Sequence, residues 1–433
     1  MSTSLRKLVI KSVQWESGEL FAMIVDVETH LPLFDPTVFA MVELRGRHLA
    51  YATIKQAMQA IRILIQFMDA KKIDLFERIH QKGVFFDINH IEQLAAICKL
   101  PQPQIDEELR LASTLPFAKA GVVTSIEKFR RKPHKNKTHQ VGTGTTNIRI
   151  NYICRYLKWY AQREIFEFAG SGRDARSVRS LIESCLVALK SRQVNDGNRN
   201  VVGKKKGVRT DIIARIHEVV DPNSPENPWR GTFNRYRNRL YVYWLLDLAI
   251  RKGEALGLTI EDIIFSEEKA NILRRPDNPN DPRGIYAPSV KTRDRVLVLG
   301  DDLLAYTEEY LEMRREFVNC GKHGYLFVSG RNGDPLSSSA ARDIFLGLRK
   351  KISDLPKDLT AHTLRHTWNS LFTTHAFATG MSDQTRNQTL RNQNGWSDTS
   401  RMPDYYSSSA IEKKAQDESL RIQKQIHALS KKF

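Results

Sequence analysis

The sequence predicts a mainly α-helical protein with a small antiparallel β-sheet, which is an α+β fold. Apolar residues recur at helical spacing over residues 51–70, at Ile54, Met58, Ile61 and Ile65. The same kind of pattern predicts further helices over residues 90–100, 146–166 and 178–194. The β-type runs are short. LVIKSVQW and LFAMIVDV flank the turn-like ESGE and predict a hairpin, and RVLVL alternates like a strand.

The chain has 433 residues, enough for two or three domains at roughly 100–200 residues per domain. The stretch NDGNRNVVGKKKGV is polar, contains glycine and is basic, which is typical of a linker. We found no internal repeat. The predicted order is an N-terminal segment 1–45 with the hairpin as an arm, a helical domain 46–195, a basic linker 196–208, a second domain 209–410 and an amphipathic tail helix 411–433.

Basic residues outnumber acidic residues by 67 to 49, a net charge of +18. Such an excess favours a polyanionic partner, because each neutralised phosphate releases a condensed counterion. RNA or a membrane surface would also suit this charge. Two basic blocks are candidate DNA contacts, and the alternative is a solvated charge run. Their residues are Lys128, Arg130, Arg131, Lys132, Lys135 and Lys137 in the first block, and Lys204, Lys205 and Lys206 in the second.

The four cysteines form no C-x-x-C pair, which disfavours a zinc site or a disulfide framework and favours a reducing compartment. The first residues lack the apolar core of a signal peptide. No stretch approaches the roughly 20 apolar residues that would span a membrane. We therefore expect a prokaryotic cytoplasmic protein that associates with the nucleoid, with no membrane partner.

Four separated fragments contain the residues for cleaving DNA without a metal. Strand cleavage needs cations to meet the charge on the phosphate oxygens, a nucleophile in line with the leaving oxygen, and a general acid. A phenol among cations is a feasible nucleophile. The fragments are AIRKGE, VKTRDRVLVL, AHTLRH and GWSDTSRMPDYY. They supply Arg251, Lys291, His362, Arg365, Trp396 and Tyr405.

In this order the fragments resemble the tyrosine recombinase family, which includes the phage integrases. AIRKGEALGLTIEDI looks like the segment with the family's first arginine, and SVKTRDRVLVL resembles its β-hairpin. HTLRH matches H-x-x-R. In GWSDTSRMPDY a tyrosine follows the glycine by ten residues, as in the family's pattern. The resemblance covers residues 240–410 and implies a helical core-binding domain that clamps the duplex together with a catalytic domain.

The resemblance implies that Arg251 and Arg365 hold the scissile phosphate together with His362. Glu254, three residues after Arg251, is expected to hold that guanidinium from behind. The alternatives are a helix-terminal arginine, a surface acid, and a helix-start histidine followed by a surface arginine. His366 is interpreted as structural, because it is adjacent to Arg365 and points elsewhere on a helix.

Lys291 is implied as the general acid for the 5′-hydroxyl leaving group, with Arg293 and Arg295 as nearby competitors. Trp396 stands where many family members carry histidine. An indole N–H donates a hydrogen bond but cannot shuttle a proton, so positioning is its expected role, and a core tryptophan is the alternative. The family mechanism requires no metal or other cofactor.

Tyr405 is the predicted nucleophile, because it follows Gly395 by ten residues, and it would form a 3′-phosphotyrosyl bond. Tyr406 is the alternative nucleophile. Adjacent helical residues point about 100° apart, so only one of the two phenols can face the phosphate. The gap between Arg365 and Trp396 is longer than is usual in the family, and an enlarged loop or helix over 374–394 is expected to hold the extra residues.

The tail carries Ala415, Ile422, Ile426 and Leu429 on one face, which must be buried somewhere. Packing on its own domain is one possibility. Docking on a neighbouring protomer is favoured, giving a homo-tetramer on double-stranded DNA, with accessory DNA-bending proteins as possible partners. The predicted function is recombination of a mobile element by integration, excision or transposition. The rivals are a type IB-like topoisomerase, a non-catalytic DNA-binding protein of the same fold, and an RNA-binding protein.

Overall fold

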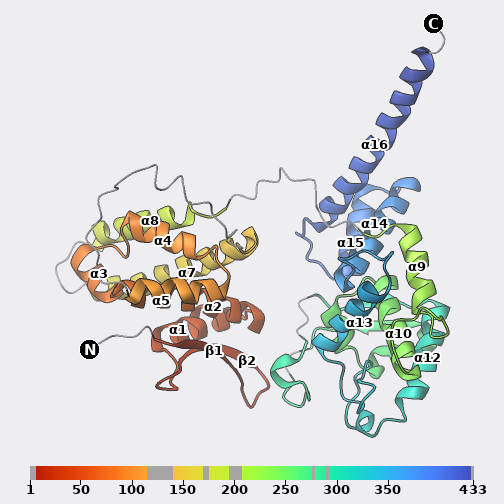
Figure 1. Ribbon diagram of the computed structural model, residues 1–433, viewed down its shortest axis with the longest axis horizontal. Coiled ribbons are helices and arrows are strands. Elements are labelled where there is room, and N and C mark those ends of the chain that lie inside the picture. The colour runs from red at the N-terminus through yellow and green to blue at the C-terminus, as the bar shows by residue number, and fades with distance from the viewer. Residues whose placement is uncertain are drawn as a thin grey trace. The chain divides into compact units, whose positions relative to one another are not determined.

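The computed structural model describes residues 6–114, 140–168, 175–194, 207–275, 278–288 and 292–430. The chain divides into two compact units, one made of residues 1–15 and 20–200 and the other of residues 16–19 and 201–433 (Figure 1). Each unit has its own apolar core. The candidate DNA-contacting residues of the two basic blocks lie outside the described residues, and so does Lys291.

In the first unit, strands β1 (Leu8–Gln14) and β2 (Leu20–Asp26) form the predicted antiparallel hairpin, with Leu8 opposite Asp26. Phe21 and Ile24 are fully buried and belong to the core that surrounds helix α2 (Tyr51–Lys71). The hairpin is therefore part of the helical unit and not a separate arm, because its apolar face is covered by that core.

Helix α2 is the central element of the first unit and contacts β2, α5 and α7. The predicted core positions Ile54, Met58, Ile61 and Ile65 are buried, and residues 63–67 are buried without a break, so the second half of the helix is enclosed on all sides. The other helices of the unit are α1 (Phe34–Phe39), α3 (Leu75–Lys82), α4 (Ile88–Ile97), α5 (Gln102–Thr114), α7 (Thr143–Phe168) and α8 (Ala175–Lys190), with short turns η1 (Ala40–Leu44) and η2 (Arg45–Arg47). The four helices predicted in this unit are confirmed, with shifted ends.

In the second unit, helix α10 (Thr232–Asp247) is buried over most of its length and packs against α12 and α14. The other helices are α9 (Thr210–Val220), α11 (Lys252–Gly257), α12 (Asp301–Arg314), α13 (Ser338–Lys351), α14 (Ala361–Ala378), α15 (Asp383–Asn394) and α16 (Met402–Ser430). Short 3-10 turns are η3 (Ile260–Asp262), η4 (Phe265–Glu267), η5 (Gly284–Tyr286) and η6 (Val318–Lys322).

The small sheet of this unit has the antiparallel order β3 (Ile263–Ile264), β4 (Lys269–Ile272), β5 (Arg295–Val298). Leu297 of β5 is buried, whereas Val296 and Val298 are exposed, so one face of the strand covers the core. The register pairs Ile272 with Arg295, which fixes the first residue of β5 at the edge of the site described below.

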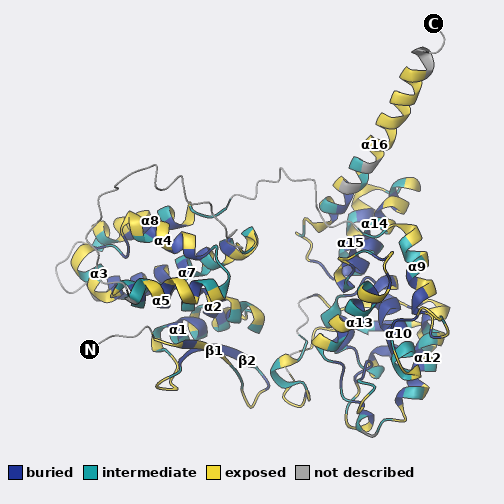
Figure 2. Ribbon diagram, viewed as in Figure 1, coloured by how far each residue is buried: buried dark blue, intermediate teal, exposed yellow. Residues whose placement is uncertain are grey.

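The extra length between Arg365 and Trp396 is helical. It forms the end of α14 and the whole of α15, joined by a turn at Gly380. Helix α16 begins beside α14 and α15 and then continues as an exposed helix (Figure 2). Of the predicted apolar stripe, Ala415, Ile422 and Ile426 are exposed, and so is the nearby Ile411, so these residues are not covered by the described part of their own unit.

Two further findings concern membrane-spanning helices and the cysteines. None of the described helices combines the length and the apolar character that crossing a membrane requires. The four cysteines are all unpaired thiols in the structure.

Candidate active site

Glu254 is a buried carboxylate that faces three arginines. It accepts the backbone N–H of Arg251 at 2.8 Å and the guanidinium of the same residue at 3.2 Å. Arg295 donates to it at 2.7 Å, Arg365 Nη1 lies 3.9 Å away, and the Thr292 hydroxyl makes a short bond to it. Burial opposes ionisation, but Arg295, Arg365 and Thr292 outweigh it and lower the pKa of Glu254 to about 2. Glu254 is therefore an anion that holds the arginines in place.

The two arginines of the predicted phosphate clamp share one backbone acceptor, the carbonyl oxygen of Asn394. Arg251 donates to it at 3.2 Å and Arg365 at 2.9 Å. Arg365 also donates at 2.5 Å to the carbonyl of Ala249, a buried residue with a left-handed φ of 52°, which is costly for a side chain with a Cβ. The side chain of Arg251 is 38% exposed and that of Arg365 only 3%. Arg251 is therefore the accessible member of the pair.

Burial, followed by the charge of Arg251, lowers the pKa of Arg365 to about 9. A guanidinium with this pKa is still charged at neutral pH. Arg365 therefore contributes positive charge to the site from an enclosed position, and its cost of burial is offset by Glu254 and by the two carbonyl acceptors.

The start of β5 is docked against the end of α15. The Arg293 N–H donates to the Gly395 carbonyl at 3.2 Å, and Arg295 Nε donates to the Gln393 carbonyl at 2.8 Å. Gly395 ends α15 with a φ of 61°, and a Cβ there would lie 2.9 Å from the Arg293 carbonyl oxygen. Glycine is required by both the left-handed turn and this close approach.

Tyr406 is the tyrosine that lies beside the arginine pair. Its ring stacks on Trp396 at a centroid distance of 6.0 Å and an interplanar angle of 12°, and Arg365 lies 5.7 Å from the Trp396 ring. Its hydroxyl lies 2.7 Å from His366 Nδ1 and accepts a long, 3.4 Å bond from Asn369. Burial raises the pKa of Tyr406 to about 12, although Asn369 and the charge of Arg365 act in the opposite direction.

Tyr405 has a different environment. It is half-buried, and burial followed by the charge of Glu412 raises its pKa. Its ring meets that of Tyr406 edge-on at 5.3 Å. The spacing from Gly395 predicts Tyr405 as the nucleophile, whereas Tyr406 is the phenol that stacks on Trp396 and whose pKa is influenced by the charges of Arg365 and Arg251. The reason is the rotation of α16, which begins at Met402 and presents successive side chains about 100° apart.

His362 and His366 lie one turn apart on α14, and their Nε2 atoms are 2.9 Å from each other. His362 is exposed and His366 is 6% exposed. The N-terminus of α14 is capped by Thr360, whose hydroxyl accepts the N–H of Thr363 at 3.3 Å, and this cap fixes the first turn on which His362 lies.

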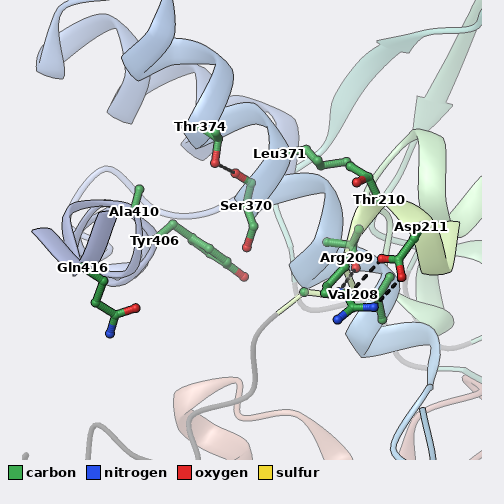
Figure 3. Close-up of a pocket in the computed structure, with 12 residues that line it drawn as sticks. Val208, Arg209, Thr210, Asp211, Ser370, Leu371, Thr374, Tyr406, Ala410 and Gln416 are labelled. Atoms are coloured by element: carbon green, nitrogen blue, oxygen red, sulfur yellow. Dashed lines mark hydrogen bonds and ion pairs between the residues drawn. The ribbon is translucent and has the colours of Figure 1, made fainter. Parts of the chain in front are cut away.

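A cavity of about 540 Å³ lies on another side of Tyr406, between α14, the start of α16 and residues 207–211 (Figure 3). Ser370 and Thr374 line it from α14, and Arg209 and Asp211 line it from the opposite wall, where they pair with each other. The Tyr406 phenol therefore has a packed side toward Trp396 and an open side toward this cavity.

Of the predicted catalytic side chains, the structure brings together Arg251, Arg365 and Trp396, with Glu254 behind the arginines. His362 contacts His366, and Tyr405 lies against the rings of His366 and Tyr406. Sequence reasoning named Arg295 only as a competitor of Lys291 and His366 only as a structural residue, and it missed Asn369 and Asn394. The H-x-x-R-H run was a signal for His366, since residues four apart share a helix face. Among the described residues, no three His, Cys, Asp or Glu side chains gather as metal ligands.

Residues 226–411 match the family model described as the phage integrase family. This part of the chain is therefore a phage integrase domain, the domain of the tyrosine recombinases, the class of enzyme that breaks and rejoins DNA strands. The part of the chain that matches contains every element of the site, from the helix before Arg251 to Tyr406.

Among curated proteins, the chain is similar to transposase A from transposon Tn554 of Staphylococcus aureus. The identity is 25% over 304 residues, which cover 68% of this chain and 70% of the transposase. Among solved structures, it resembles the XerA recombinase at 16% identity and a TM-score of 0.36, covering 89% of this chain and 97% of that one. It also resembles the Tn1549 transposon integrase in complex with circular intermediate DNA, at 17% identity and a TM-score of 0.44, covering 78% and 97%. These TM-scores are too low for the two structures to support further conclusions.

Proposed function

We propose that this chain recombines the DNA ends of a mobile element, with Tyr406 as the nucleophile and Arg251 as the main phosphate contact. The observation that carries the proposal is an arginine pair held by the buried carboxylate of Glu254, with Trp396 against Arg365 and the Tyr406 ring stacked on Trp396. The similarity to a transposase supports transposition, integration or excision as the biological outcome.

In the proposed mechanism, the scissile phosphate binds at Arg251, whose guanidinium is open to solvent and preoriented by Glu254. Arg365, which is buried next to Arg251, adds positive charge and its remaining N–H donors. Fixed cations stabilise the oxygens of the phosphorus transition state most strongly where water is excluded. Trp396 contacts Arg365 and stacks on Tyr406, and so fixes the position of the Tyr406 ring. The Tyr406 oxygen bonds to phosphorus and the bond to the 5′-oxygen breaks, leaving a 3′-phosphotyrosyl link.

Lys291 stays our candidate for protonating the leaving 5′-oxygen. It lies outside the described residues, but the next residue, Thr292, bonds to Glu254 within the site. A 5′-hydroxyl from a second DNA then attacks the phosphotyrosine and reverses the chemistry on a new partner. The bond energy is kept in the covalent link, so the reaction needs no external energy source.

We also propose that the basic blocks of residues 128–137 and 204–206 contact the DNA backbone. Phosphate contacts of this kind position a protein without reading sequence. The exposed apolar stripe of α16, with Ile411, Ile422 and Ile426, supports docking of the tail on a neighbouring protomer in a tetramer on DNA. The protein would then act at the nucleoid, and DNA-bending proteins could assist the assembly.

A set of nicked duplexes from the two ends of the genomic element that encodes the chain tests the proposal. The nick is placed at successive positions, so that cleavage near it releases a short strand and traps the covalent complex. The wild type should give a protein–DNA band after denaturation, and so should Tyr405→Phe. Tyr406→Phe should give none. The reverse result for the two variants would move the nucleophile to Tyr405.

The same preparation distinguishes the topoisomerase rival. A recombinase joins strands from two differently labelled duplexes, whereas a topoisomerase reseals the strand that it cut. Relaxation of a supercoiled plasmid without the element's ends, in the absence of joined products, would contradict recombination.

A further inference from the structure

One oxygen of the Glu254 carboxylate connects two parts of the site. Glu254 Oε1 accepts a bond from the Arg251 guanidinium at 3.2 Å and also a bond from the hydroxyl of Thr292. Arg251 is the accessible arginine of the pair, and Thr292 follows Lys291 directly in the chain. The atom that orients the proposed phosphate contact therefore also holds the neighbour of the proposed general acid.

Thr292 is a fixed point just before β5. Its side chain is buried, and a Cβ added to Gly395 would lie 3.0 Å from the Thr292 Cβ. The next residue, Arg293, donates its backbone N–H to the Gly395 carbonyl at 3.2 Å. Glu254 is ionised and can only accept, so the Thr292 hydroxyl is the donor of their bond. The side chain of Thr292 is therefore held by α11, and the backbone after it by the end of α15.

The two arginines that follow in the chain are engaged in other contacts. Arg293 pairs with Asp398 at 2.9 Å. The side chain of Arg295 is 6% exposed and donates to Glu254 at 2.7 Å. A guanidinium also keeps its proton at neutral pH, whereas an ammonium among cations gives one up more readily. Among these cations, Lys291 is therefore the one suited to protonate a leaving oxygen.

A lysine needs a fixed backbone to act in this way. A general acid must lie within hydrogen-bond distance of the atom that it protonates. The lysine ammonium is carried on a flexible four-carbon stem, so its reach is limited mainly by where its backbone is held. The bond between Thr292 and Glu254 supplies such a restraint one residue away, and it refers that restraint to the carboxylate that also orients Arg251.

We propose that Thr292 is a positioning residue whose bond to Glu254 places Lys291 for protonation of the 5′-oxygen of the phosphate held by Arg251. This inference rests on the proposed function, but it is the same whichever tyrosine attacks. As the bond between phosphorus and the 5′-oxygen breaks, a proton of the Lys291 ammonium moves to that oxygen and leaves a neutral amine. The amine takes the proton back when a 5′-hydroxyl attacks the phosphotyrosine.

Thr292→Val tests the proposal, because valine keeps the shape of threonine and removes the hydroxyl that bonds to Glu254. The rate of covalent-complex formation is measured in a single turnover on the nicked duplexes. We expect it to fall by about 100-fold, the size of effect that a small misplacement of a reacting group produces. Thr292→Ser keeps the hydroxyl and should remain within about threefold of the wild type.

A duplex in which sulfur replaces the bridging 5′-oxygen at the cleaved position shows which part of the site is disturbed. A thiolate leaves without being protonated, so on this duplex Thr292→Val and Lys291→Ala should both come within about threefold of the wild type. Arg251→Ala should stay slow on both duplexes, because either leaving group needs the phosphate contact. The ratio of the two rates is taken on one preparation and so does not depend on the fraction of folded protein.

Two further variants check the coupling between Thr292 and Lys291. On the oxygen duplex, Lys291→Ala combined with Thr292→Val should be no slower than Lys291→Ala alone, because the two changes remove the same function. Thr307→Val makes the same substitution at a buried threonine of α12, whose hydroxyl bonds to the Leu303 carbonyl. This control should cleave both duplexes at the wild-type rate per folded molecule.

The results distinguish a failure of this inference from a failure of the proposed function. A wild type that forms no covalent complex on either duplex, or a Lys291→Ala variant that sulfur does not relieve, contradicts the proposed function. If sulfur relieves Lys291→Ala but not Thr292→Val, Thr292 supports the arginine and not the lysine, and this inference alone is overturned. A Thr292→Val variant that cleaves the oxygen duplex as fast as the wild type overturns it as well.

Discussion

The central helices of the two units, α2 and α14, bury opposite kinds of side chain. Of the eleven buried residues of α2, ten are apolar and Gln66 is the exception. Of the nine buried residues of α14, six are polar: Thr363, Arg365, His366, Thr367, Asn369 and Thr373. Burying a polar group costs free energy unless it is hydrogen-bonded, and these six all have partners. α2 therefore contributes mainly stability, whereas α14 fixes the geometry of the site at a cost that its hydrogen bonds offset.

The most severe test of this difference is Glu254→Gln, which removes the carboxylate between Arg295 and Arg365. Two buried guanidinium groups then lose their counter-charge, so the free energy of unfolding should fall by about 4 kcal/mol. Cleavage by the folded fraction should fall by about 100-fold, because Arg251 loses its orientation. Urea denaturation measures the change in unfolding free energy. Covalent-complex formation on the nicked duplexes measures the change in cleavage. Glu261→Gln, an exposed acid of η3, is the control, and equal behaviour of the two variants would refute the central role of Glu254.

The pH dependence of unfolding, compared between the wild type and Glu254→Gln, tests whether Glu254 is ionised in the folded protein. The folded-state pKa of Glu254, about 2, lies below its ordinary value of 4.5. A depressed carboxyl pKa stabilises the fold above the ordinary value, and this contribution is lost as the pH falls toward the folded value. A shift of this size corresponds to about 3 kcal/mol. The difference in unfolding free energy between the wild type and Glu254→Gln should stay constant above about pH 5 and shrink as the pH falls to about 2. A difference that grows in acid would contradict the assignment.

Leu64→Ala addresses the other side of the comparison. Leu64 of α2 is fully buried, and truncating such a leucine leaves a cavity in a packed core. The first unit should lose about 3 kcal/mol of stability, measured by urea denaturation. The rate of chemical cleavage, per bound and folded molecule, should not change. A change in the pH profile of cleavage would show that α2 and the site are coupled.

The smallest effect on stability is expected for Ile422→Ser in the exposed stripe of α16. The side chain is 50% exposed, so the free energy of unfolding should change by no more than about 0.5 kcal/mol. If the stripe docks on a neighbouring protomer, assembly on DNA should weaken, which native gels with a two-site duplex would show. Ser419→Ala, on the same exposed helix, is the control. Unchanged assembly would place the docking surface elsewhere.

Much of the fold follows from local patterns in the sequence. The spacing of Ile54, Met58 and Ile61 predicts α2, and the alternation in RVLVL predicts β5, because periods of 3.6 and 2 reflect one buried face. The observed ends of the helices differ from the predicted ends by up to several residues. The hairpin of β1 and β2 was correctly located, but its packing on α2 depends on a contact between distant segments that no local pattern records.

The sequence by itself determined the chemistry, since Arg251, His362, Arg365, Trp396 and a tyrosine pair occur in order at spacings that few other functions require. Only the tertiary structure shows that Tyr406 is the buried phenol stacked on Trp396 and that Tyr405 is the more exposed one, because adjacent residues of the same type differ only in the direction in which α16 points them. It also shows that the Glu254 carboxylate binds both Arg251 and Arg295, and that the Tyr406 hydroxyl lies within hydrogen-bond distance of His366. Those contacts join α11, β5, α14 and α16, and segments so far apart in the chain meet only once the core has packed.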